Sequence, residues 1–462
     1  MHFIGFIHSD LLYLFIMAWR AKMLLSPPLL FTFILKSQKL MINFKSPVSA
    51  IIISIAICGN CRTAGAQTNP AHFKSHQFRS EYIFPVQDLH VHSSSIVEMP
   101  GGDLLVCWFE GSGERKANDV VVRGARLTNG TSEWSKPFTL ADTPGHPDCN
   151  PVLFMDQENR LFLFWIVVQA NRWETSILKS KVSSQYLKDG APEWEWQDII
   201  LLKPDEEFVE TIRNGFHESN SQGLAWAEYA PLYEKMIVEA ARDPKKRETG
   251  WMTRTHPLQL PGGRMLLPLY SDGFNLSLIA ISDDNGKSWQ PGLPIVGRGN
   301  VQPSLVRKKN GDLVAFMRDN GDEPGRVMKS VSVDNGFHWS IAQKTLIHNP
   351  GSSVATISLN NGDWIMIYND SENGRHRLAV SLSIDEGETW SWTRHLENRK
   401  DGEGSFSYPS VIQADDGQIH VTYSFHLSGK KTINHVAFST DWLKENKKES
   451  TTSSDESCGD FS

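Results

Sequence analysis

The sequence predicts an all-β protein, a six-bladed β-propeller of four-stranded antiparallel blades with one helical insertion. Three copies of a short turn motif recur at an almost constant interval, and short strand patterns fill the chain between turn residues. A fixed period of about 50 residues is typical of repeat architectures, in which each unit packs on its neighbours. Closing such units into a ring protects the edges of their sheets, which favours a propeller.

The turn motif reads S-x-D-x-G-x-x-W. Its copies span Ser282–Trp289, Ser332–Trp339 and Ser383–Trp390, so their tryptophans are 50 and 51 residues apart. The Asp side chain can bond the backbone that follows it, and Gly tolerates a positive φ, so the motif predicts a tight hairpin turn. The Trp is expected to pack on the neighbouring unit.

Strand patterns support the same fold from about residue 83 onward. Runs with a period of two follow Gly-Asp, Asn-Gly and Asp-Gly turns at residues 101–109, 310–318, 361–369 and 416–425, as expected for short antiparallel strands. At roughly 50 residues per blade, residues 67–443 fit six blades. The segment 204–249 breaks the pattern and has helical periodicity. It is expected to be an insertion over one face, either a lid or partner contact or the filling of a long connection.

Residues 1–66 have the features of a leader and a secretory signal peptide. Met41 is the expected true start, Lys45 supplies the charge, Val48–Cys58 is apolar, and Ala64–Ala66 is a small-residue cleavage site. We therefore expect a secreted or periplasmic protein.

A lipoprotein anchored at Cys58 or Cys61, or a membrane anchor near the N-terminus, is the alternative. Apolar runs before the signal are broken by Arg20, Lys22 and Pro27, so none reaches the roughly 18 residues of a membrane span. No integral span is expected in the mature chain. Residues 444–462 have too little apolar content to fold and are expected to be disordered.

Charge and cysteine content exclude several classes of protein. Without its first 66 residues the chain has 40 basic and 52 acidic residues, which disfavours binding to nucleic acid because phosphate contacts need clustered Lys and Arg. Cys107, Cys149 and Cys458 remain, too few for a disulfide framework. No Cys/His cluster with the spacing of metal ligands occurs, so neither a catalytic metal nor another cofactor is expected. The alternative is a metal ion bound by His90 and His92, which share one strand face.

The turn motif is an Asp-box, and it resembles the turns on the blades of sialidases. The resemblance covers most of residues 82–440. It implies an exo-acting enzyme that cleaves a terminal keto-sugar acid from a glycan, with three arginines on the sugar's carboxylate, a Tyr nucleophile activated by a Glu, and an Asp as acid/base. Sialidases are a recognised exception to the two-carboxylate rule of glycoside hydrolysis.

Three positions match the catalytic pattern of sialidases. Tyr408, nine residues before the turn glycine Gly417, lies in a segment similar to the one that carries the nucleophile. Arg318 resembles the second arginine of the carboxylate clamp, and Arg375, or its neighbour Arg377, resembles the third. Bidentate guanidinium contacts are suited to holding a carboxylate in one orientation.

Two positions depart from that pattern. Gln302 stands where a sialidase has its Glu, and His92 stands where the first clamp arginine is expected. A free phenol with a pKa near 10 is ionised about once in a thousand at pH 7, so a base normally assists it. Gln302 can orient Tyr408 but cannot accept its proton.

The acid/base is expected in the loop after the first inner strands. Glu110, Glu114 and Asp119 are the candidates there, and Glu114 is favoured because Asp119 matches a structural Asp. Further polar residues are expected where the inner strands meet the axis. Those assigned to substrate binding are His90, Asn150, Arg254 and Asp272, and those grouped with them are His146, His256 and Asn349. Imidazole titrates near neutrality and so suits proton transfer.

Three functions are compatible with these residues. The first is a sialidase-like exo-glycosidase acting on a terminal acidic sugar. The second is a polysaccharide lyase directed at uronates. In that reaction Arg and Gln neutralise the carboxylate and His or Tyr removes the C5 proton, so a glutamine at position 302 suits it. The third is a carbohydrate-binding propeller without activity.

Overall fold

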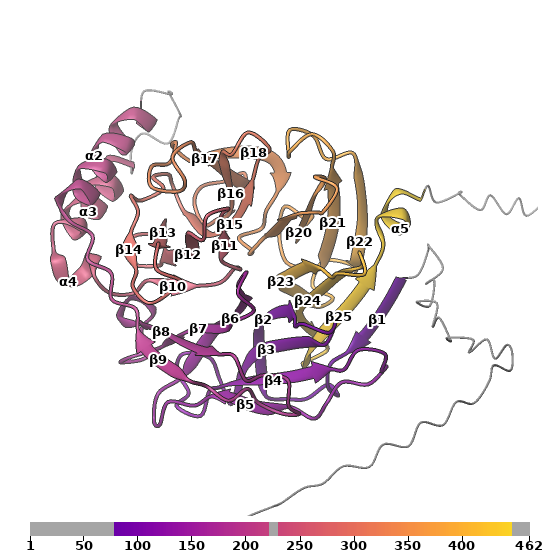
Figure 1. Cartoon of the computed structure of the whole chain (residues 1–462). Coiled ribbons are helices and arrows are strands. Elements are labelled where there is room, and N and C mark those ends of the chain that lie inside the picture. The colour runs from indigo at the N-terminus through magenta and orange to yellow at the C-terminus, as the bar shows by residue number, and fades with distance from the viewer. Residues whose placement is uncertain (1–77, 221–229, 446–462) are drawn as a thin grey trace, which may run out of the picture. The chain divides into compact units, whose positions relative to one another are not determined.

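The computed structural model of the protein describes residues 78–220 and 230–445. The leader and signal-peptide prediction for residues 1–66 lies outside this range, and so does nearly all of the predicted disordered tail. Six antiparallel sheets form the described part, and Figure 1 shows them as the blades of a propeller around a central axis. The predicted fold is therefore confirmed.

The first three blades follow one another along the chain. Blade 1 contains β2 (His90–Glu98), β3 (Leu104–Gly111), β4 (Val121–Leu127) and β5 (Phe138–Ala141). Blade 2 contains β6 (Asp148–Met155), β7 (Leu161–Val167), β8 (Ile177–Ser183) and β9 (Trp196–Ile199). Blade 3 contains β10 (Met252–Thr253), β11 (Leu258–Gln259), β12 (Met265–Ser271), β13 (Leu276–Ser282) and β14 (Gln290–Pro291). In blade 3 two short strands, β10 and β11, both pair with β12, so its innermost strand is interrupted.

The remaining blades include the N-terminal strand. Blade 4 contains β15 (Asn300–Arg307), β16 (Leu313–Asp319), β17 (Arg326–Ser332) and β18 (Gln343–His348). Blade 5 contains β19 (Ala355–Ser358), β20 (Trp364–Asn369), β21 (Arg377–Ser383) and β22 (Trp392–Asn398). Blade 6 contains β23 (Ser405–Gln413), β24 (Ile419–Leu427), β25 (Lys430–Phe438) and, as its outermost strand, β1 (Phe78–Tyr82). The pairing of β1 with β25 joins the two ends of the described chain and closes the ring (Figure 1).

Helices occur in three places. The helical insertion predicted from the sequence contains α2 (Glu206–Asn220), α3 (Ala230–Ala241) and α4 (Pro244–Arg247). A short 3-10 helix, η1 (Trp173–Thr175), lies in the connection between β7 and β8, and α5 (Thr440–Lys444) follows the last strand. Within the described residues, none of the helices combines the length and apolar character that crossing a membrane requires.

Each Asp-box forms the hairpin turn that the sequence predicts. In the first copy, Ser282 Oγ donates to Asp284 Oδ1 at 2.8 Å and accepts from the backbone N–H of Gly286 at 2.9 Å. The backbone N–H of Ser288 also donates to Asp284 Oδ1, at 2.9 Å. Equivalent bonds hold the second and third copies. The carboxylate thus satisfies backbone donors that a tight turn would otherwise leave unpaired.

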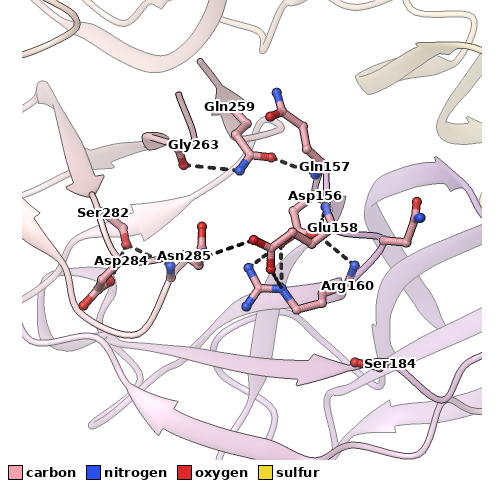
Figure 2. A network of polar contacts seen from close by, with 12 residues as sticks. Asp156, Gln157, Glu158, Arg160, Ser184, Gln259, Gly263, Ser282, Asp284 and Asn285 are labelled. Atoms are coloured by element: carbon pink, nitrogen blue, oxygen red, sulfur yellow. Dashed lines mark hydrogen bonds and ion pairs between the residues drawn. The ribbon is translucent and has the colours of Figure 1, made fainter. Parts of the chain in front are cut away.

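The boxes also pack each blade on the preceding one. Trp289 of blade 3 meets Phe164 of blade 2 edge-on, with ring centroids 5.7 Å apart, and Trp390 of blade 5 meets Phe316 of blade 4 at 6.0 Å. Figure 2 shows the polar contacts around the first box, where Asn285 Nδ2 donates to Glu158 Oε1 of blade 2 at 3.1 Å. The motif therefore holds consecutive blades together at the outer rim.

Serine side chains link the innermost strands around the axis. Ser95 Oγ accepts from the backbone N–H of Leu153 at 3.0 Å, which joins blade 1 to blade 2. Ser304 Oγ and Ser410 Oγ make the corresponding bonds to Thr356 at 2.9 Å and Ile96 at 3.1 Å, and join blade 4 to 5 and blade 6 to 1. These bonds satisfy buried backbone groups at the places where neighbouring sheets diverge.

The packing of the first box leads to a stability prediction. Gly286 has a φ of 81°, and a Cβ there would lie 2.9 Å from Phe162 Cε1. Gly130 has a similar φ of 79°, and a Cβ there would meet nothing within 4 Å. Gly130→Ala is expected to lower the free energy of unfolding by about 1 kcal/mol through its backbone conformation alone. Gly286→Ala is expected to cost about 1–3 kcal/mol more because of the contact.

Urea unfolding of both variants measures the difference between them. Equal losses of stability would show that the Asp-box glycine is not in close contact with the preceding blade.

Candidate active site

The candidate active site is built on β-bulges in four innermost strands. The ladders of β2, β6, β15 and β23 with their neighbours each contain a register shift. One residue other than glycine has a positive φ at each shift: Ser93 at 59°, Asn150 at 49°, Gln302 at 57° and Tyr408 at 57°. A bulge changes the direction of a side chain, and strained residues of this kind concentrate at functional sites.

The hydroxyl of Tyr408 is the point at which the predicted residues meet. Gln302 Nε2 donates to Tyr408 Oη at 3.1 Å, and Arg318 Nη1 donates to the same oxygen at 3.4 Å. The ring of His92 lies against the Tyr408 ring, with centroids 4.1 Å apart. Residues 92, 302, 318 and 408, which are distant in the sequence, thus form one cluster.

Two further guanidinium groups face the ring of Tyr408. The Cζ of Arg254 lies 4.7 Å from the ring centroid, and that of Arg375 lies 5.5 Å from it. Arg375 Nη2 donates to the Gly351 carbonyl at 2.9 Å. Burial lowers the pKa of Arg375, and the nearby Arg318 charge acts in the same direction, whereas Tyr408 and Glu114 oppose them. Three positive charges therefore surround one phenol.

Arg254 and His256 lie in the gap between β10 and β11, and their side chains contact blades 1 and 6. Arg254 is only 2% exposed and donates to the Pro409 carbonyl at 2.9 Å and to the Ser94 carbonyl at 3.4 Å. Burial lowers its pKa to about 10. His256 Nε2 lies 2.9 Å from Ser95 Oγ and 3.0 Å from Ser410 Oγ. This short segment of blade 3 is thus bonded to blades 1 and 6.

A cavity of about 600 Å³ lies at the other end of the inner strands. Its lining includes Arg254, His256 and Ser410. The Tyr408 hydroxyl and its partners do not line this cavity, which is separated from them by Arg254 and Pro409.

Two carboxyl groups lie near the arginines. Burial raises the pKa of Glu114, although Arg115 and Arg375 oppose the change, and the negative charge of Asp272 raises it further. Burial also raises the pKa of Asp272, against the charges of Arg318 and Arg115. Glu114 lies 3.9 Å from Arg115. A carboxyl with a raised pKa retains its proton closer to neutral pH, as a general acid requires.

Three histidines line one side of the cluster. His90 and His92 have ring centroids 5.8 Å apart, and His426 lies 6.1 and 5.8 Å from them. Burial lowers the pKa of His90 to about 4 and that of His92 well below its usual range. Both imidazoles are therefore neutral at pH 7. Across the described ranges, no group of three or more His, Cys, Asp or Glu side chains could hold a metal ion.

Asn150 is linked to the site by Tyr270, a residue that the sequence analysis did not single out. Its Nδ2 donates to Tyr270 Oη at 3.1 Å, and burial raises the pKa of Tyr270 well above its usual range, while a hydrogen bond with Gln302 opposes the change. Proline follows Asn150, Gln302 and Tyr408 directly. Because proline inside a strand is typical of a bulge, this pattern was the available signal for the site's geometry.

Other candidates have structural partners elsewhere. Arg377 is exposed at the start of β21, and Glu110 accepts bonds from Gln87 and Trp108. Asp119 accepts from the backbone and hydroxyl of Ser112 and so closes its own loop.

Two residues of the axial group also have local roles. The His146 ring bonds the Pro144 carbonyl in an exposed loop. Asn349 is buried, donates to the Ser352 carbonyl at 2.8 Å and accepts from the backbone N–H of Ser352 at 3.0 Å.

Comparison with known proteins agrees with this architecture. The model of the BNR repeat-like domain matches residues 102–253 and 239–421. The chain belongs to this family.

Individual relatives of this BNR repeat-like protein are sialidases. It is 27% identical over 187 residues to a sialidase of Vibrio cholerae, an alignment that covers 33% of this chain and 23% of the relative. It is 24% identical over 280 residues to human Sialidase-4, covering 54% and 50% of the two chains. The chain thus spans half or less of the length of these curated relatives.

A solved structure shares the fold. The leech intramolecular trans-sialidase superposes with a TM-score of 0.56 at 14% identity, covering 77% of this chain and 68% of that one.

The partly buried imidazole of His256 leads to a prediction about pH. Burial lowers the pKa of His256 to about 4, so between about pH 6.5 and 4 the unfolded chain binds more protons than the folded one. Stability is therefore expected to fall as pH falls through this window, by at most about 1.4 kcal/mol per pH unit from this one group. His256→Gln is expected to make the dependence shallower by up to that amount.

Urea unfolding at several pH values from 7 to 4.5 measures the slope. His217→Gln, at an exposed position of α2, controls for loss of a histidine. An unchanged slope in His256→Gln would contradict the lowered pKa of the His256 imidazole.

Proposed function

We propose that this BNR repeat-like protein is a sialidase-like exo-glycosidase that removes a terminal acidic sugar from a glycan. The observation that carries the proposal is the position of Tyr408 Oη, which accepts from Gln302 Nε2 and Arg318 Nη1 among three guanidinium groups. The sialidase names of its relatives support the same reaction class. Export by the predicted signal peptide is part of this proposal.

Substrate binding is assigned to Arg318 and Arg375. Both lie at the edge of the cluster with partly exposed side chains, and Arg318 Nε has no hydrogen-bond partner. A carboxylate on the sugar would accept from these guanidinium groups and bring the anomeric carbon toward Tyr408. Charge-assisted bonds of this kind contribute about 1.5–3 kcal/mol each.

Tyr408 is the proposed nucleophile. Two N–H donors point at its oxygen, and Arg254 and Arg375 face its ring. These groups stabilise negative charge on the oxygen as the phenol loses its proton, which compensates for the missing Glu by electrostatics. The oxygen then forms a bond to the anomeric carbon, and water later cleaves that bond.

His92 is the proposed acceptor of the phenol's proton. Its imidazole is neutral, and Nδ1 is buried without a partner. Burial lowers the pKa of His92 most, followed by the neighbouring His426 and then by the positive charge of Arg375. A substrate carboxylate on Arg375 would offset that charge, so binding would make His92 a stronger base.

Glu114 is the proposed acid for the leaving group. Its raised pKa and its position beside Asp272 and Arg375 allow it to hold a proton next to a bound acidic sugar. Transfer of this proton to the glycosidic oxygen releases the rest of the glycan.

A uronate lyase is the second candidate, because one observation favours it. A neutral His92 lies against Tyr408, and Gln302 replaces a carboxylate. This arrangement suits abstraction of the C5 proton of a uronate whose charge is neutralised by arginine and glutamine. An inactive propeller would bind a glycan without converting it.

Tyr408→Phe is expected to abolish turnover while leaving ligand affinity within about tenfold, because the nucleophile is lost and the arginines remain. Arg318→Ala is expected to weaken binding by about 2 kcal/mol. Tyr82→Phe, an exposed tyrosine on β1, is the control and should keep full activity. Product release from sialylated and uronate-bearing glycans is the measurement, and turnover close to wild type in Tyr408→Phe would refute the proposal.

The two reactions differ in their products. Hydrolysis is expected to release a saturated acidic sugar with no new ultraviolet absorbance, because it creates no double bond. A lyase would instead produce an unsaturated uronide whose absorbance rises with time and disappears in His92→Gln. Absorbance of the wild-type reaction on a uronate-bearing glycan therefore decides between them.

A further inference from the structure

A separate cavity lies between the helical insertion and blades 2 and 3. Its volume is about 650 Å³. It is lined by residues of α3 and α4, by the connection around η1, and by the connection between β12 and β13. In Figure 1 these helices flank blade 3. None of the residues assigned above to the candidate active site lines this cavity.

The cavity lies beside Asp272 of the candidate active site. Ser271 and Gly273, the neighbours of Asp272 in the chain, both line it. So does Glu174, whose negative charge raises the pKa of Asp272 and whose own pKa is lowered in part by Arg115. A Cβ at Gly273 would lie 3.4 Å from Glu174 Cβ. The cavity therefore adjoins the end of the site where Glu114 and Asp272 lie.

Two lysines that line the cavity have no acidic partner among the described residues. Its carboxylates are Glu174, which pairs with Arg172 at 2.6 Å, and Glu239, which faces Lys235 at 3.9 Å. Lys245 and Lys246 also line it. In the described part of the chain, no carboxylate lies within ion-pair distance of either lysine ammonium.

One wall of the cavity is apolar. Met236, Ile237 and Ala240 of α3 face it together with Phe274. Met236 is 66% exposed, which is unusual for a large apolar side chain. A sugar ring presents an apolar face that can lie on such a wall while its charged substituent reaches the lysines.

We propose that this cavity binds the sugar unit on the leaving-group side of the scissile bond and favours a unit that carries a sulfate or carboxylate. This inference rests on the proposed function, because it places the leaving group beside Glu114. The helical insertion then acts as a specificity element, and Lys245 and Lys246 supply the positive charge that recognises the neighbouring unit. Tyr408 and the arginines still define the terminal sugar.

Three substrates with the same terminal acidic sugar test the inference: an aryl glycoside, a glycan with a neutral second sugar, and a glycan with a sulfated second sugar. Lys245→Ala/Lys246→Ala is expected to raise KM for the sulfated glycan by about tenfold. Its kcat, and all constants for the aryl glycoside, should remain unchanged. Lys188→Ala/Lys287→Ala removes the same charge at exposed positions away from the cavity and should leave all three substrates unaffected.

A uniform change across the three substrates, or no change for the sulfated one, would overturn the inference. Failure of the proposed function gives a different result, namely no turnover of any substrate by the wild-type protein. Calorimetric titration with a sulfated disaccharide then decides the question independently. Binding about tenfold weaker in Lys245→Ala/Lys246→Ala would support the subsite, and equal affinity would overturn it.

Discussion

The arrangement of the site depends on a buried arginine at the axis of the ring. Arg254 interrupts the innermost strand of blade 3 and donates to carbonyl groups at the bulges of blades 1 and 6, while its charge faces the ring of Tyr408. A buried cation needs compensating contacts. Arg254 has two carbonyl oxygens and an aromatic ring, so the same group contacts Tyr408 and the bulges of blades 1 and 6.

The rest of the fold supports that constraint from the outside. Asp-box turns fix the rim between consecutive blades, and serine hydroxyls join the inner strands across the gaps between sheets. Strands held at both ends can keep strained residues such as Gln302 and Tyr408 at a positive φ. Glu114 and Asp272 lie on loops next to these rigid strands, as is usual for functional residues on a stable scaffold.

The electrostatics of the site differ from those implied by the sialidase pattern at two positions, Gln302 and the neutral His92. Glutamine in place of glutamate removes a negative charge beside Tyr408, so the three guanidinium groups face the phenol without a competing carboxylate at that position. The cluster is therefore strongly cationic before a ligand binds. This state suits an anionic ligand, because the ligand supplies the charge that the chain itself lacks.

The sequence by itself determined the fold and most members of the cluster. Asp-box spacing depends on local turn chemistry, and the positions of Tyr408, Arg318 and Gln302 relative to their turn glycines follow from the length of each strand. Only the tertiary structure decided that Tyr270 completes the site, that Arg254 lies beneath the tyrosine, and that the helical insertion encloses a cavity beside Asp272. Those relations join residues on different blades, and contacts between blades depend on how the whole ring closes, which local patterns do not encode.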